Sequence, residues 1–115
     1  MLTVRQQHTN QPVASWVEIA ESYSARMTGL IGRKRLEEGR GLLIKKCSSV
    51  HTFFMNFPID VLYLDDENTV VAVQTNLKPW RFGGIHRGAK HVLELRSMTA
   101  GWVSKGDTLI FEEGT

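Results

Sequence analysis

Two apolar runs separated by four polar residues constrain the fold more than any other feature of the chain. Residues 59–64 and 69–75 are rich in Val, Leu, Ile and Tyr, and the segment Asp65-Asp66-Glu67-Asn68 lies between them. Residues of these types favour strands, and a short polar connection between two such runs is typical of a β-hairpin. The sequence therefore predicts two antiparallel neighbouring strands in the middle of the chain.

Further short apolar runs continue this pattern along the chain. They are interrupted by turn residues, such as the Gly106-Asp107 pair before the last run. No repeat, low-complexity segment or linker divides the chain, so its 115 residues predict a single domain over residues 1–115. The additional predicted strands cover residues 16–20, 42–44, 91–95 and 108–111.

One segment has helical periodicity instead. Apolar residues follow Tyr23 at i+4, i+7 and i+8, which is the pattern of a buried helical stripe, and Gly32 is placed to end a helix. This predicts a helix from about Ser22 to Gly32. Together these elements predict a mainly β (α+β) fold: an antiparallel β-barrel or β-sandwich of short strands with one covering helix.

The composition is that of an ordinary globular protein. Hydrophobic residues make up 42% and charged residues 23%, and the net charge of +2 excludes a polycation built to coat nucleic acid. Cys47 is the only cysteine, so the chain has no intramolecular disulfide, which fits a reducing compartment. No apolar run reaches the length of a signal peptide or membrane span. We therefore expect a soluble, cytoplasmic protein.

The segment after residue 46 concentrates chemically capable side chains. Cys47, His51 and Met55 are each four residues apart, which places them on one face of either a strand or a helix. Sulfur ligands with an imidazole suit copper(I) and, less well, zinc, so these three residues are a candidate metal set. In a strand, however, positions four apart lie about 13 Å from each other. The alternative is structural: Met55 packs in the core, His51 bonds a backbone carbonyl and Cys47 is a small buried apolar residue. Phe53, Phe54 and Met55 continue the apolar core before Pro58, and the sequence predicts no cofactor.

Two carboxylates raise a second alternative, a hydrolase-like enzyme. With His51, Asp60 or Glu94 could form an acid–base pair. As a structural residue, Asp60 would instead accept backbone N–H bonds where a strand begins. Glu94 lies between Leu93 and Leu95, so its side chain points away from theirs, either to solvent or into a pocket.

Residues 78–90 form a long predicted loop with a basic and aromatic composition. Loops of about a dozen residues are often functional in compact domains. Aromatic rings can stack on a sugar or a base, and guanidinium groups can clamp an anion. In the alternative, Trp80 and Phe82 fold back onto the core. The basic and aromatic side chains are Lys78, Trp80, Arg81, Phe82, His86, Arg87 and Lys90.

Several segments, in this order and spacing, resemble the domain-of-unknown-function family 192 (DUF192). The resemblance covers about residues 13–111 and implies a small β-rich fold, but it brings no accepted activity. Ile31 stands where the family usually has Met, and Ser97-Met98 stands where a small residue followed by Gly is common. The segments are 26–33 (RMTGLIGR), 41–44 (GLLI), 51–61 (HTFFMNFPIDV), 77–80 (LKPW), 92–95 (VLEL) and 106–107 (GD).

We therefore expect a non-enzymatic binding module for a small anionic or sugar-like ligand or a peptide partner. A near-zero net charge and the absence of a phosphate-cradling glycine loop or nucleic-acid motif speak against a nucleic-acid partner. The candidate ligand-binding residues are His51, Met55, Asp60, Lys78, Trp80, Arg81, His86, Arg87 and Glu94.

Overall fold

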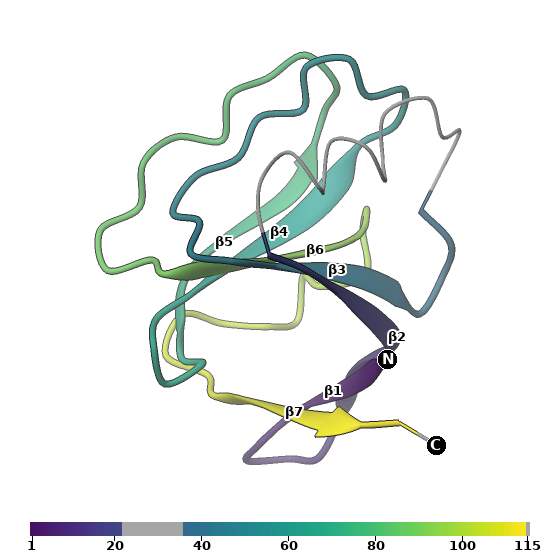
Figure 1. The fold of residues 1–115 in the computed structure, drawn as a ribbon, viewed down its shortest axis with the longest axis vertical. Helices are drawn as coiled ribbons and strands as arrows, with labels where there is room; N and C mark the ends of the chain where they lie inside the picture. Colours follow the sequence, from purple (N-terminus) through teal and green to yellow (C-terminus); the bar gives the residue numbers. More distant parts are fainter. Residues whose placement is uncertain (22–35, 115) are drawn as a thin grey trace.

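Within the part of the chain that the structure describes, the strands form one seven-stranded sheet (Figure 1). The computed structural model describes residues 1–21 and 36–114, so the predicted helix from about Ser22 to Gly32 lies outside the described residues. None of the described residues belongs to a helix with the length and apolar character needed to cross a membrane. The strands are β1 (Leu2–Gln6), β2 (Pro12–Ala20), β3 (Arg40–Lys45), β4 (Ile59–Leu64), β5 (Val70–Leu77), β6 (His91–Arg96) and β7 (Leu109–Glu113).

The sheet is mixed. Its strand order is β5-β4-β6-β3-β2-β1-β7, and every neighbouring pair is antiparallel except β2 and β3, which are parallel. The predicted hairpin is confirmed as β4 and β5. The predicted antiparallel arrangement therefore holds for every pair except β2 with β3, where residues 21–39 form a connection long enough for a parallel crossover.

The sheet curls until its two edge strands meet at one end. Thr69, just before β5, and Thr108, just before β7, form an isolated bridge, and their hydroxyl oxygens lie 3.1 Å apart. The Val70 N–H donates to the Asp107 carbonyl at 2.8 Å beside this bridge. Since the edges meet only there, the fold is an open half-barrel rather than a closed barrel or a two-sheet sandwich.

Two clusters of buried side chains lie on opposite faces of this sheet. The inner core lies inside the curl and receives at least one buried residue from every strand. The loop-side core lies on the other face, where loops 46–58 and 78–90 contribute Val50, Met55, Phe57 and Ala89. Strand β4 is buried along its whole length because its side chains alternate between the two cores. This explains why residues 59–64 form an almost continuous apolar run.

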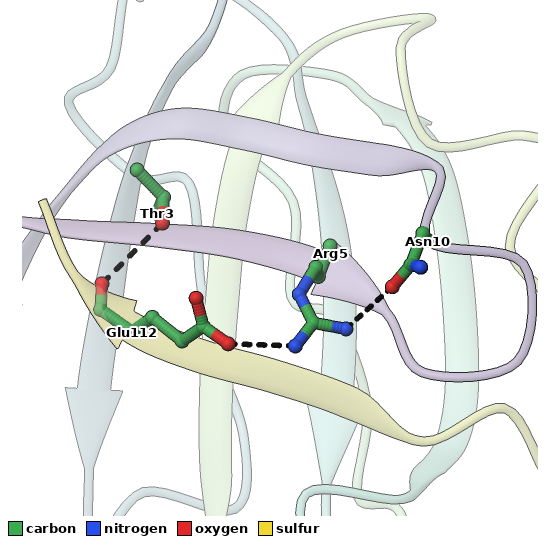
Figure 2. A network of polar contacts seen from close by, with 4 residues as sticks. All are labelled: Thr3, Arg5, Asn10 and Glu112. Carbon is green, nitrogen blue, oxygen red and sulfur yellow. Dashed lines mark hydrogen bonds and ion pairs between the residues drawn. The ribbon is translucent and has the colours of Figure 1, made fainter.

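The sequence does not predict strand β1. It pairs with β2 on one side and with β7 on the other, although only Leu2 and Val4 give it apolar alternation. The Arg5 guanidinium donates to the Asn10 side chain and to the Glu112 carboxylate, both at 2.6 Å (Figure 2). These exposed polar contacts connect β1 with the edge strand β7 and with the turn that leads into β2.

Candidate functional site

Loops 46–58 and 78–90 run side by side above the ends of β4 and β5 (Figure 1). His51 and Phe82 form an antiparallel bridge between them. The next residue, Thr52, is fully buried and holds the second loop in place. Its N–H donates to the Arg81 carbonyl at 2.8 Å, its carbonyl accepts from the Trp80 N–H at 2.9 Å, and its hydroxyl accepts from the Arg81 N–H at 2.9 Å.

Five ring side chains of these loops form what we call the aromatic surface. It consists of His51, Phe53, Phe54 and Trp80, whose rings are connected by contacts, and of Phe82, whose backbone pairs with that of His51. The exposed fractions of the last four are 37%, 57%, 56% and 58%. The ring centroids of Phe54 and Trp80 are 4.8 Å apart, and those of His51 and Phe53 are also 4.8 Å apart. Phe53 lies 6.2 Å from Trp80 and joins the two pairs. The predictions that place Phe53 and Phe54, or Trp80 and Phe82, in the core are therefore wrong.

The backbone at two of these rings is strained. The φ angles of Phe54 and Trp80 are +67° and +63°, in the left-handed region that bulky residues rarely adopt. Each such residue costs on the order of 1–3 kcal/mol and persists only where the surrounding structure enforces it. Here Thr52 enforces it, because its carbonyl accepts from both the Trp80 N–H and the Met55 N–H. The outward position of the rings is thus built into the fold.

A network of hydrogen bonds from β4 and β5 supports loop 78–90. The Tyr63 hydroxyl donates to the Gln74 side-chain oxygen at 2.5 Å, and the Gln74 amide donates to the Gly83 carbonyl at 2.7 Å. The same carbonyl lies 2.8 Å from His86 Nε2, and the His86 ring packs on Tyr63 with 3.9 Å between centroids. His86 therefore braces the loop instead of projecting from it.

Replacing Gly83 by Ala tests this support. An added Cβ would lie 2.6 Å from the Tyr63 hydroxyl and 3.0 Å from the Gln74 side-chain oxygen. We expect Gly83→Ala to lower the free energy of unfolding by about 1–3 kcal/mol, measured by urea denaturation. Gly101→Ala is the matched control, because nothing lies within 4 Å of its Cβ position. Equal stability of the two variants would show that the network can accommodate the added methyl group and that the close approach of Gly83 is not required.

The two loops also carry a local excess of positive charge. Loops 46–58 and 78–90 contain five Lys and Arg residues and no Asp or Glu. Subtracting this +5 from the net +2 of the chain leaves −3 for the other residues. A local excess of this size steers anions toward the loops. The five exposed cations are Lys46, Lys78, Arg81, Arg87 and Lys90.

Asp60 has a structural role. Its side chain is fully buried, and both carboxylate oxygens accept from backbone amides. Oδ1 accepts from Asn76 at 2.8 Å and Met98 at 2.9 Å, and Oδ2 accepts from Thr99 at 2.9 Å and Ala100 at 2.8 Å. The interpretation of Asp60 as an acceptor of backbone bonds is confirmed, and its buried carboxylate is not exposed to a ligand.

Glu94 is buried as well. It pairs with Leu42 of β3 and Val61 of β4, so its side chain points toward the loop-side core, away from Leu93 and Leu95 in the inner core. The prediction that the Glu94 side chain points away from Leu93 and Leu95 is therefore confirmed. Of the two environments predicted for it, solvent is excluded, since Glu94 is fully buried.

The candidate metal residues lie in different surroundings. Met55 is buried in the loop-side core, and His51 stacks on Phe53. The Cys47 thiol donates to the Ser49 carbonyl at 2.9 Å. Within residues 1–21 and 36–114, no three His, Cys, Asp or Glu side chains are grouped so that they could hold a metal ion. Cys47 also lines a surface pocket of about 340 Å³ together with Lys46, Ser48, Asp66, Ala89, Lys90 and His91.

The structure thus separates the predicted site residues into two groups. Lys78, Trp80, Arg81 and Arg87 are exposed on the loop and His51 is half-buried beside them, whereas Met55, Asp60 and Glu94 are buried and His86 is a half-buried brace. Phe53 and Phe54 are the site residues that the sequence misses. The Asn56-Phe57-Pro58 sequence that follows indicates a turn rather than a continuous buried strand, but it does not show which of the neighbouring rings are exposed, since Phe57 itself is buried.

These features define a class of small, mainly β domains built on one curled seven-stranded sheet with ring-bearing loops at one end. The chain belongs to the family described as "Uncharacterized ACR, COG1430" (DUF192), whose model matches residues 3–111. This confirms the resemblance seen in the sequence. The UPF0127 protein of Pyrococcus abyssi is 38% identical over 84 residues, which cover 68% of this chain and 68% of that protein. The UPF0127 protein of Pyrococcus horikoshii is 38% identical over 86 residues, covering 70% and 74%.

Two crystal structures share the fold. One is described as a candidate transcription regulator from Sinorhizobium meliloti 1021, with a TM-score of 0.77 and 23% identity over 96% of this chain and 91% of that one. The other is a protein of unknown function from Novosphingobium aromaticivorans DSM 12444, with a TM-score of 0.76 and 18% identity over 95% and 82%. At these identities the similarity shows the fold alone.

Proposed function

We propose that this protein is a non-enzymatic binding module whose ligand contacts the aromatic surface. The observation that carries the proposal is the pair Phe54 and Trp80, whose packed rings are more than half exposed on left-handed backbone. Burial of large rings normally stabilises a domain of this size. Holding these rings at the surface loses the free energy of burying them and adds the cost of a left-handed backbone. Such a pair of rings marks a site of interaction.

The surroundings of these rings support binding of a small anionic or sugar-like ligand or a peptide. Flat ring faces stack on sugars, bases and apolar side chains, and the exposed Lys78 and Arg81 lie on either side of Trp80 in the sequence. Because Thr52 already fixes the loop, little conformational entropy is lost when a ligand binds. The surface is therefore preorganised for recognition.

Removal of the Trp80 ring is the corresponding test. In two-dimensional NMR titrations with sugars, nucleotides, short oligonucleotides and peptides, we expect one ligand class to shift resonances of loops 46–58 and 78–90. Trp80→Ala is expected to weaken the binding free energy of that ligand by about 1–2 kcal/mol, as for a central aromatic contact. Trp16→Ala is the matched control, because Trp16 is 41% exposed but lies on β2.

Two results would count against the proposal. One is a set of shifts that clusters around Trp16 and spares both loops. The other is an equal loss of affinity in Trp16→Ala and Trp80→Ala, which would show that the aromatic surface has no special part in binding.

A further inference from the structure

We infer that the ligand of the aromatic surface is a short stretch of single-stranded nucleic acid. This inference rests on the proposed function and assigns a chemical class to the same site. Two independent properties of the loops carry it: the arrangement of the rings and the separation of charge.

Four of the rings form a row of successive contacts, which offers more than one place for a base to stack. His51, Phe53, Trp80 and Phe54 follow one another with centroid separations of 4.8, 6.2 and 4.8 Å. A single planar ligand would cover only part of this row, whereas successive unpaired bases can each stack on a ring. Of these rings, Phe53, Phe54 and Trp80 are 37%, 57% and 56% exposed, so ring surface is accessible for bases to stack on.

The positive charge of the two loops, together with the rings, favours a ligand that carries both planar groups and several negative charges. The two loops carry five Lys and Arg and no carboxylate, against −3 for the other residues once this +5 is subtracted from the net +2. The small net charge, which speaks against nucleic acid when the chain is considered as a whole, hides this separation. A neutral sugar needs no such excess of cations, and acidic polysaccharides and peptides lack a flat aromatic face at each unit. A single strand supplies both a base and a phosphate per nucleotide.

The contacts at Trp80 bring the two properties together. In the sequence Lys78-Pro79-Trp80-Arg81-Phe82, cations alternate with rings. The Arg81 guanidinium folds back beside Trp80 and donates to its carbonyl at 3.4 Å. A base stacked on Trp80 would therefore have a guanidinium beside it to meet the adjoining phosphate.

Fluorescence anisotropy with a labelled oligothymidylate of roughly ten nucleotides tests the inference. We expect binding at low salt, stronger competition from unlabelled single strand than from duplex, and much weaker competition from thymidine monophosphate. Trp80→Ala and Phe54→Ala should each weaken binding roughly tenfold. Trp16→Ala should bind as the unmodified protein does, and circular dichroism should show all variants folded.

The salt dependence of binding tests the phosphate contact separately. Loss of one phosphate contact lowers the slope of log K against log salt by about 0.7 for a single strand. We expect this change in Arg81→Ala. Lys105→Ala is the control, since Lys105 is exposed outside the two loops and should leave the slope unchanged.

Three outcomes would overturn the inference. The first is equal competition by heparin, combined with no effect of Trp80→Ala, which would reduce binding to charge alone. The second is equal affinity for the monophosphate and the oligonucleotide, which would indicate a single-nucleotide site. The third is absence of oligonucleotide binding while a sugar or peptide gives Trp80-dependent NMR shifts. In that third case the proposed binding function stands and only the ligand class is wrong, whereas loop resonances that respond to no ligand would remove both.

Discussion

Replacement of Asp60 by Asn is expected to lower the free energy of unfolding by roughly 3–5 kcal/mol. The buried carboxylate accepts four backbone N–H bonds, two on each oxygen. Asn keeps one oxygen, so two charge-assisted bonds are lost, each contributing about 1.5–3 kcal/mol. The side-chain NH2 group of Asn would also face two of the backbone N–H groups, so that hydrogen-bond donors would point at donors. The loss would affect three segments, because Asp60 on β4 holds Asn76 on β5 and residues 98–100 after β6.

Equilibrium urea unfolding followed by circular dichroism measures this effect. Asp65→Asn is the matched control, because Asp65 uses only Oδ1, which accepts from the Glu67 N–H at 2.8 Å and the Thr69 N–H at 3.0 Å. Asn retains that oxygen, so we expect a loss below about 1 kcal/mol. If Asp60→Asn were no more harmful than Asp65→Asn, the four amides would have to find other acceptors, and the structural role assigned to Asp60 would be wrong.

Local patterns predict most strands of this fold but not their arrangement. Strands β3 to β7 are predictable because each contains an apolar run bounded by turn residues. Strand β1 is not predicted, because two apolar residues, Leu2 and Val4, are too few to show alternation. The parallel pairing of β2 with β3 and the contact between Thr69 and Thr108 depend on residues far apart in the chain. No local signal reports such pairings, so the half-barrel emerges only in three dimensions.

The site shows the same division between local and non-local information. Lys78, Trp80 and Arg81 are predicted because a basic, aromatic loop is visible as composition. Phe53 and Phe54 are predicted to be buried, since apolar residues in an apolar segment usually are. Their exposure follows from the left-handed backbone at Phe54 and from the bonds of Thr52 to the neighbouring loop, both of which are tertiary effects. These two rings therefore enter the site only through the structure.

Met55 connects the stability of the fold to the aromatic surface. Its side chain is buried in the loop-side core, and its N–H donates to the Thr52 carbonyl at 3.2 Å, next to the outward-facing Phe54. Truncation to Ala leaves a cavity, and we expect Met55→Ala to lower the free energy of unfolding by about 2–5 kcal/mol. We also expect weaker ligand binding, because Phe54 loses the buried anchor beside it. Urea denaturation and the NMR titration measure the two effects.

Met55→Leu distinguishes packing from ligand contact. Leu has nearly the same volume, so we expect a loss below about 1.5 kcal/mol and unchanged ligand binding. Met98→Ala controls for the loss of a methionine as such, because its side chain is 76% exposed and its removal should have little effect on stability. A Met55→Leu variant that stays stable but no longer binds the ligand would contradict a purely packing role. Such a result would assign the thioether sulfur itself to the site.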